Sequence, residues 1–348
     1  MKDILIRRIR VQEDTDAVKL WNGCAEAGET LYTPMTRLEF RHKFFNPAGV
    51  MAAAEYGGRF AGFAHAAYPG TFPGAKPGRA YLTVVMVPPS FRGLGIGRAL
   101  VNDLKRRMKA LNAESLWISS VNPVNLSWRI PGTPGHGHNN MPGADMAADG
   151  FGFLLSQGFE TVCREEAMYL NLAGCQIDPA MQDLRQRLLS EGIYTGRYDP
   201  ARDYGFDRMC DRVGSEYWRF VLRTEIAAWK TQTPNADPAL WADGIPPKGP
   251  RPLLIAAHEG EIIGFTGPVD VQKNGRGWFT GICVDPAYRR RGIGKALFHM
   301  LLQSFAESGA SYTSLFTGTD NPARSIYLSA GMRGVRLFAL MRAGLTEL

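Results

Sequence analysis

Two short stretches of the chain repeat one spacing of basic and glycine residues. Residues 91–100 read FRGLGIGRAL and residues 288–297 read YRRRGIGKAL. In each, an arginine is followed three residues later by Gly-Ile-Gly and then by a second basic residue. Glycine has no Cβ, so its backbone approaches a ligand closely, and arginine binds phosphate oxygens through several N–H donors. The pattern predicts an anion-binding loop that occurs twice.

A strand is predicted before each loop and a helix after it. The strands, at 81–87 and 277–284, are rich in β-branched and aromatic residues. Apolar residues then recur at three- and four-residue steps, which predicts a helix. Because a helix N-terminus has unpaired N–H donors and partial positive charge, it binds phosphate. The predicted phosphate-binding residues are Arg92, Gly93, Leu94, Gly95, Ile96, Gly97 and Arg98 in the first copy, and Arg289, Arg290, Arg291, Gly292, Ile293, Gly294, Lys295 and Ala296 in the second.

The repeat extends beyond the loops. A hairpin-like stretch precedes each loop and an Asn-Pro pair follows it, so that matching features stand 197 to 202 residues apart in the same order. This order indicates the duplication of a whole domain. The length of 348 residues also suits two domains. We expect them at residues 1–172 and 173–348, joined in a stretch that contains Gly and Pro.

Two other phosphate loops do not fit. A Walker A loop needs GxxxxGK[ST] and a Rossmann loop needs GxGxxG, and neither copy has either pattern. Both copies fit R-x-x-G-x-G-x-A, and in this the sequence resembles the GNAT superfamily of N-acetyltransferases. The resemblance continues in Val87-Pro88, Val284-Asp285-Pro286, NPARSIYLSAGM (321–332) and LLSQGFE (154–160). It covers nearly the whole chain. It implies two tandem GNAT domains of the α/β (α+β) class, each a mixed, mostly antiparallel sheet flanked by helices.

The resemblance implies acetyl-CoA, or another acyl-CoA, as co-substrate. The pyrophosphate would lie on the glycine loop, and the pantetheine arm would pair with a strand backbone like an added strand. Beyond the loops, the cofactor-binding residues that follow from this are Ile282, Cys283, Val284 and Asn321 in the second domain and Val85, Met86 and Val87 in the first.

The implied chemistry is direct transfer without a covalent enzyme intermediate. A neutral amine attacks the thioester carbonyl, and a backbone N–H near the strand end stabilises the developing oxyanion. Tyr327 stands at the family's tyrosine position, and a phenol with a pKa of about 10 is a reasonable proton donor to the leaving thiolate. The alternative is that Tyr327 is an aromatic residue of the core.

The first domain departs from the family pattern where the proton donor is expected. Counting forward from the Asn-Pro pair gives Trp128, and counting back from the last glycine gives Leu154; neither delivers a proton. The two counts disagree because residues 129–154 are an insertion, rich in Gly and Pro, which predicts a long loop with a lid or contact role. His136 and His138 within it predict no metal site. We expect a non-catalytic first domain and catalysis in the second.

The general base and the acceptor site stay open. Carboxylates that could take a proton are also typical surface charges or helix caps, and aromatic residues near the expected acceptor site are also typical of core packing. The carboxylate candidates are Glu225, Asp270 and Asp320, and the aromatic candidates are Tyr217, Trp218 and Trp229.

Composition excludes several classes of protein. The N-terminus has no apolar segment of signal-peptide length and no stretch has the length of a membrane span, which predicts a cytoplasmic protein that does not bind membranes. The net charge of +7 comes without a lysine-rich run, so nucleic acid is not an expected partner. The cysteines lack zinc spacing and suit a reducing compartment; they are Cys24, Cys163, Cys175, Cys210 and Cys283.

We therefore predict an acetyl-CoA-dependent N-acetyltransferase that acts on a small-molecule primary amine. The alternatives are a non-enzymatic module that binds or senses acyl-CoA, and a protein N-acetyltransferase. The sequence leaves open the acyl-chain preference, CoA binding by the first domain, and whether the protein is a monomer or a homodimer.

Overall fold

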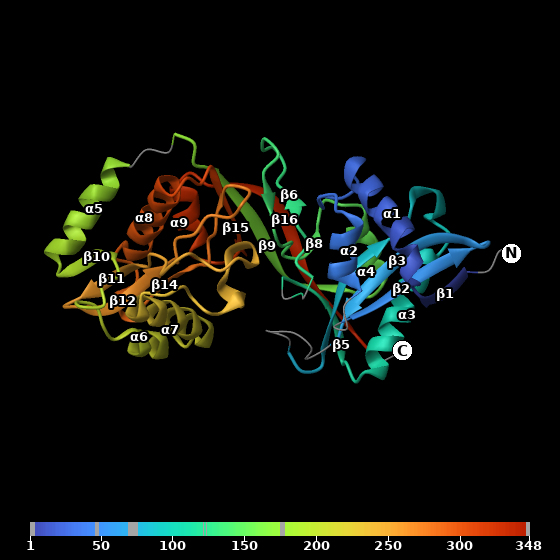
Figure 1. The fold of residues 1–348 in the computed structure, drawn as a ribbon, viewed down its shortest axis with the longest axis horizontal. Coiled ribbons are helices and arrows are strands. Elements are labelled where there is room, and N and C mark those ends of the chain that lie inside the picture. Colours follow the sequence, from blue (N-terminus) through green and yellow to red (C-terminus); the bar gives the residue numbers. More distant parts are fainter. Residues whose placement is uncertain are drawn as a thin grey trace. The chain divides into compact units, whose positions relative to one another are not determined.

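The computed structural model describes residues 4–45, 49–68, 76–120, 122, 124–174 and 178–345. The chain forms two compact units (Figure 1). Unit 1 comprises Met1–Ala167 together with Val335–Leu348, and unit 2 comprises Met168–Gly334. In both, helices flank mixed, mostly antiparallel sheets, which confirms the predicted fold class. Within the described ranges, no helix combines the length and apolar character needed to cross a membrane.

The sheet of unit 1 is antiparallel except at one position. Its strands follow the order β1 (Ile4–Arg8), β2 (Gly49–Tyr56), β3 (Arg59–Ala67), β4 (Arg79–Met86), β5 (Ser115–Ile118) and β16 (Arg333–Gly344), and β8 (Ala144–Asp145) also pairs with β16. Strands β4 and β5 run parallel and are joined by helix α3 (Ile96–Ala110), the helix that the sequence predicted after the glycine loop.

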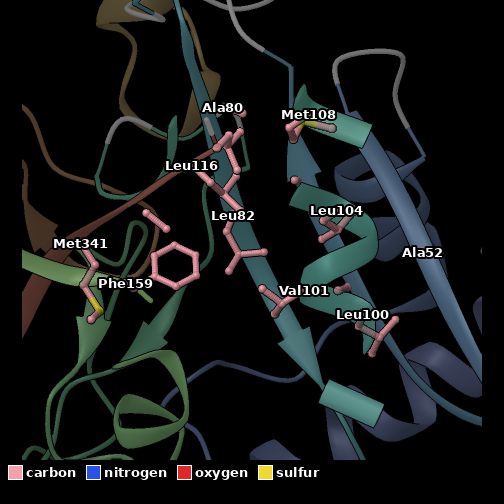
Figure 2. Packing of buried hydrophobic residues seen from close by; sticks show 14 of the residues in the cluster. Ala52, Ala80, Leu82, Leu100, Val101, Leu104, Met108, Leu116, Phe159 and Met341 are labelled. Carbon is pink, nitrogen blue, oxygen red and sulfur yellow. The ribbon is translucent and has the colours of Figure 1, made fainter. Parts of the chain in front are cut away.

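Helices cover both faces of this sheet because its strands alternate apolar residues between the faces. On one face, α3 packs Leu100, Val101 and Leu104 into a buried cluster with Leu82 of β4. Figure 2 shows Val101 of α3 directed toward the strand that carries Leu82. On the other face, α1 (Asp14–Glu26) and α2 (Arg37–Phe44) form a separate cluster around Trp21.

The last strand of the chain belongs to the first unit. Met341 of β16 is fully buried and pairs with Ile118 of β5, so the chain returns to complete the sheet of unit 1. Strand β9 (Glu160–Asn171) runs from unit 1 into unit 2. The predicted domains, residues 1–172 and 173–348, are the two segments of the proposed duplication. Their boundaries stay a prediction.

Unit 2 has a similar arrangement, but its strands belong to two different sheets. An antiparallel sheet has the order β10 (Ile193–Arg197), β11 (Leu254–His258), β12 (Glu261–Thr266) and β14 (Ile282–Val284), whereas β13 (Arg276–Gly277) and β15 (Tyr312–Gly318) form a parallel pair in another sheet. Helix α8 (Ile293–Glu307) packs on one face of β11 and β12. Helices α6 (Phe206–Val213) and α7 (Glu216–Thr231) pack in a second cluster with alternate residues of the same strands.

The remaining elements are short or peripheral. They are 3-10 turns η1 (Val11–Glu13), η2 (Pro89–Phe91), η3 (Pro238–Leu240), η4 (Ala242–Gly244) and η5 (Pro286–Tyr288), strands β6 (Trp128–Arg129) and β7 (Gly137–His138), and helices α4 (Gly150–Ser156), α5 (Pro179–Ser190) and α9 (Arg324–Ser329). Among the described cysteines, Cys24, Cys210 and Cys283 are buried free thiols, and Cys163 is exposed; Cys175 lies outside the described residues.

Candidate active site

The two glycine loops have the same backbone conformation. Gly292 caps α8 with φ of 91°, and Gly95 caps α3 with φ of 84°. Two residues earlier, Arg290 has φ of 63° where unit 1 has Gly93 with φ of 78°. Residues other than glycine rarely adopt this left-handed backbone conformation. Unit 2 therefore holds a cation at a position where the conformation favours glycine.

The first arginine of each loop contacts the preceding strand. Nε of Arg92 donates to the carbonyl of Val87 at 3.0 Å, and Nε of Arg289 donates to the carbonyl of Val284 at 3.2 Å. Both arginines thus fix the loop to the strand end. The predicted phosphate contact is left to their other guanidinium nitrogens.

The two loops differ in how their arginines are paired with carboxylates. In unit 1, the guanidinium of Arg92 forms an ion pair with Glu29 and holds the pKa of that carboxyl below its usual value. In unit 2, Arg289 has no ion pair within the described residues, and Arg291 reaches Glu191 only at 3.9 Å. The loop of unit 2 therefore keeps more unpaired positive charge for an anionic ligand.

Several predicted loop residues are buried. Ile96 is 1% exposed, as is Ile293, and Ala296 is fully buried, so these side chains pack in the core. The backbone N–H groups of Ile96 and Ile293, in the first turn of each helix, can face a ligand, whereas the Ala296 amide donates to the Gly292 carbonyl at 2.9 Å. A Cβ on Gly292 would also lie 2.9 Å from Leu184 of α5, so α5 packs closely against this loop.

Strand β14 presents a free edge in unit 2. The parallel pairing of β13 with β15 ends at Gly277 and Thr313, and among the described strands β14 pairs only with β12. The amide of Asp285 donates to the Ile263 carbonyl at 2.8 Å, so by alternation the backbone groups of Ile282 and Val284 point away from β12. An unpaired edge of this kind accepts an extended ligand as an added strand.

Strands β4 and β5 of unit 1 diverge in the same way, but other residues fill the space. Their parallel pairing covers Arg79–Tyr81, which leaves Val85, Met86 and the following Val87 beyond it. The cavity between Leu82, Thr83 and Ile118 on the strands and Asn140, Met141 and Gly143 of the insertion is only about 20 Å³. That volume holds about one water molecule. The insertion therefore occupies the place where an extended arm would enter.

Tyr327 is buried among aromatic residues. It is 5% exposed, and its ring meets those of Phe298 and Phe279 edge-to-face, with centroids 5.0 and 5.7 Å away. Burial raises the pKa of Tyr327 to about 12. The phenol therefore stays protonated at neutral pH, which is the state that a proton donor needs.

The structure decides between the two counts for the equivalent position in unit 1. Gly158 follows α4 and Gly331 follows α9 with φ of 78° and 87°. Counting back from these glycines pairs Leu154 with Tyr327. Trp128 instead lies on β6 at the start of the insertion, is 1% exposed and donates to the Asn140 carbonyl at 2.8 Å.

His138 and Asn321 also have structural contacts. His138 stacks on Trp128 at 5.9 Å and accepts from the Asn140 amide through Nδ1. The carboxamide of Asn321 accepts from the Ala323 amide at 3.0 Å and donates to Thr317 Oγ1 at 3.0 Å. These bonds shape the turn before α9, and contact of Asn321 with a cofactor stays a prediction. Burial raises the pKa of Cys283 to about 12, so its thiol is not a nucleophile at neutral pH.

Two of the three candidate bases share one arginine. Glu225 of α7 is fully buried and pairs with Arg251, and Asp270 pairs with the same guanidinium at 2.8 Å. Asp320 is exposed in the turn after β15. The contact of Glu225 with Arg251 and Asn235 was missed by sequence reasoning, since these residues lie on separate segments and form no motif.

The aromatic candidates take three different environments. Tyr217 is exposed, whereas Trp229 donates its indole N–H to the Arg251 carbonyl at 2.7 Å. Trp218 packs against Phe265 and over Gly281, where a Cβ would lie 2.2 Å from the indole ring. Core packing thus accounts for Trp218 and Trp229.

Comparison with known proteins gives consistent results. A model of the acetyltransferase (GNAT) family matches residues 16–127 and 217–332. Over 101 residues the chain is 35% identical to mycothiol acetyltransferase of Clavibacter michiganensis subsp. michiganensis (strain NCPPB 382), a match that spans 28% of this chain and 31% of the relative.

Two solved structures are similar over nearly the whole chain. One contains the GCN5-related glucosamine N-acetyltransferase region of a fungal multi-domain GH3 β-N-acetylglucosaminidase, with a TM-score of 0.67, 13% identity, and coverage of 98% of this chain and 38% of that chain. The other is a tandem GNAT protein from the clavulanic acid biosynthesis pathway, with a TM-score of 0.54, 15% identity, and coverage of 99% and 100%. At such identities the likeness concerns the fold alone.

Proposed function

Because the chain belongs to the GNAT acetyltransferase family, as its sequence predicted, we propose that it transfers the acetyl group of acetyl-CoA to the primary amine of a small molecule, and that unit 2 carries out the reaction. The observation that carries the choice of unit is the contrast at equivalent positions. Unit 2 has a cationic loop, a free β14 edge and Tyr327, whereas unit 1 has the Arg92–Glu29 pair, the insertion and Leu154.

The residues of unit 2 fit acetyl-CoA. The N-terminus of α8 and the cations Arg289, Arg290, Arg291 and Lys295 would bind the pyrophosphate. The edge of β14 would pair with the pantetheine arm, since Ile282 and Val284 direct backbone groups away from β12. The buried side chains around Tyr327 exclude water from the reacting thioester.

The reaction then needs two contributions from the protein, one at the carbonyl oxygen and one at the leaving sulfur. A neutral amine forms a bond to the thioester carbonyl carbon, and the Val284 N–H donates to the oxygen on which negative charge develops. The carbon–sulfur bond breaks as Tyr327 donates its proton to the departing thiolate. The nitrogen releases one proton to water as the amide forms, and water returns a proton to the Tyr327 phenolate. The products are an N-acetylated amine and free CoA.

A small-molecule acceptor is favoured over a protein. The partial match to a mycothiol acetyltransferase supports an amine of low molecular weight. Residues of unit 2 also enclose a groove of about 400 Å³, which suits a small ligand.

The test measures free thiol released from acetyl-CoA with a panel of amines. The Tyr327→Phe variant is expected to lose about two orders of magnitude in kcat, because a general acid contributes about 10²- to 10⁴-fold. Leu154→Phe, at the equivalent position of unit 1, serves as the matched control and should keep the full rate. Equal rates for wild type and Tyr327→Phe would refute the role of Tyr327. CoA binding without transfer to any amine would instead favour a non-enzymatic module.

A further inference from the structure

A groove in unit 2 lies outside the elements that would bind acetyl-CoA. Its volume is about 400 Å³, and its walls are the segment IPPKGPRP (245–252) and the loop from Asp270 to Lys273. Proline fixes φ near −65°, so the four prolines of the first wall restrict its conformation before a ligand binds.

Polar contacts hold the two walls together. The carboxylate of Asp243 accepts from the Lys273 amide at 2.6 Å and from the Gln272 side chain at 2.7 Å. Nη1 of Arg251, in the first wall, donates to Asp270 of the second wall at 2.8 Å. The groove is therefore defined by side-chain hydrogen bonds as well as by the path of the chain.

At one side of the groove, two carboxylates share one guanidinium, and this cluster has a net negative charge. Arg251, 5% exposed, is shared by the carboxylates of Glu225 and Asp270, so the three formal charges add to −1. One oxygen of Glu225 and the Nε of Arg251 are buried without a hydrogen-bond partner in the described part of the chain. Of the two carboxylates, only Asp270 lines the groove, and its side chain is 23% exposed. An ammonium group at Asp270 would offset the excess charge, because charges interact strongly at partly buried sites.

The exposed lining of the groove carries two lysines and one carboxylate, that of Asp243, so its net formal charge is positive. Lys248 and Lys273 both line it and both are exposed. An amine that reached Asp270 would therefore carry its far end toward two ammonium groups. An anionic substituent at that end would be attracted, whereas a second cation would be repelled.

The groove is also connected to the predicted reaction centre. The carbonyl of Asp270 accepts from the Trp278 amide at 2.9 Å, and the Arg251 guanidinium lies 5.5 Å from the centroid of the Trp278 ring. The next residue, Phe279, meets Tyr327 edge-to-face. Two successive residues thus link this carboxylate cluster to the proposed proton donor.

We infer that this groove binds the acceptor, and that the acceptor is an amine with an anionic group, its ammonium at Asp270 and its anion toward Lys248 and Lys273. This rests on the proposed function, since it takes the ligand of the groove to be the acetyl acceptor. The bound ammonium gives up one proton to water before the neutral amine attacks.

The experiment uses matched pairs of amines that differ in charge at one end. 4-Aminobutyrate is compared with 4-aminobutyramide, and 2-aminoethyl phosphate with 2-aminoethanol. Binding is measured by saturation-transfer NMR and acetyl transfer by thiol release, with the full-length protein. The variants are Lys248→Ala/Lys273→Ala and Asp270→Asn, and Lys230→Ala, an exposed lysine of α7 outside the groove, is the control.

The anionic member of a pair should have a KM about tenfold below that of its neutral partner, as expected for one charge-assisted contact. The double lysine variant should remove this difference, and Asp270→Asn should raise KM about tenfold for both members. Equal KM values within each pair, or an unchanged difference in the lysine variant, would overturn the inference. Thiol release that no groove variant alters would refute the groove and leave the proposed function intact. Anion-dependent binding without thiol release would support the groove's ligand chemistry and refute the proposed function.

Discussion

Replacement of Arg290 by glycine separates the charge of the loop from its conformation. Arg290 has φ of 63°, and the equivalent Gly93 has φ of 78°, so glycine fits the same backbone path. Arginine in this conformation costs about 1–2 kcal/mol. Glycine removes that cost but adds about 0.4–1 kcal/mol of unfolded-state entropy. We expect the Arg290→Gly protein to be as stable as wild type, or more stable by up to about 1 kcal/mol.

The same replacement should weaken acetyl-CoA binding. A hydrogen bond to a charged group contributes about 1.5–3 kcal/mol, and because Arg290 is exposed, we take the lower end of that range. This corresponds to about a tenfold increase in Kd. Titration calorimetry with acetyl-CoA gives Kd, and urea unfolding gives the free energy of unfolding.

The matched control is Gly93→Arg in unit 1. A Cβ there meets no atom within 4 Å, so the backbone conformation alone determines the cost. This variant should lose up to about 1 kcal/mol of unfolding free energy, because the lower unfolded-state entropy of arginine offsets part of the conformational cost, and it should keep the wild-type Kd. An unchanged Kd in Arg290→Gly would refute the phosphate role of Arg290. A tighter Kd in Gly93→Arg would show that unit 1 binds the co-substrate.

Two further predictions concern pH and the C-terminal strand. Burial raises the pKa of Tyr327 to about 12, so its protonated form persists far above neutral pH. The kcat with an amine acceptor should therefore rise with pH and then stay level up to a pH of about 10. A fall in kcat near pH 8 to 9 in the wild type that disappears in Tyr327→Phe would contradict this. Met341→Ala should destabilise unit 1 by about 2–5 kcal/mol, since a fully buried side chain is lost. Hydrogen exchange should then accelerate at Leu116 and Ile118 of β5, and faster exchange confined to unit 2 would refute the pairing of β16 with β5.

Much of the site follows from local sequence patterns. The glycine loops, the strand before each and the helix after each were predicted from residues close together in the chain, and the structure has them at β4 and α3 and at β14 and α8. The strand predicted at 277–284 was too long: β14 covers only Ile282–Val284, and Gly277 belongs to the separate strand β13. Helix capping and a left-handed glycine depend on a few neighbouring residues, so a local pattern predicts them. The contact of Arg289 with the Val284 carbonyl, five residues away, was not predicted, because arginine was assigned to phosphate.

Contacts between distant segments could not be predicted in this way. The pairing of Arg92 with Glu29 and of Glu225 with Arg251 joins residues 63 and 26 positions apart, and no motif relates them. The insertion left both Trp128 and Leu154 as candidates for the position equivalent to Tyr327, since counts from its two sides disagree where residues have been added. The return of β16 to unit 1 has no local signal either, because an apolar strand pairs with whichever sheet edge the fold brings to it.

The sequence by itself determined the family, the duplication and the loops that suit an acyl-CoA pyrophosphate, because these depend on residue types at short and fixed spacing. Only the tertiary structure decided what surrounds each loop. It places Glu29 against Arg92, fills the divergence of β4 and β5 with the insertion, and leaves the edge of β14 free. Charge compensation and filled space arise from packing between segments far apart in the chain, so two nearly identical loops acquire different surroundings.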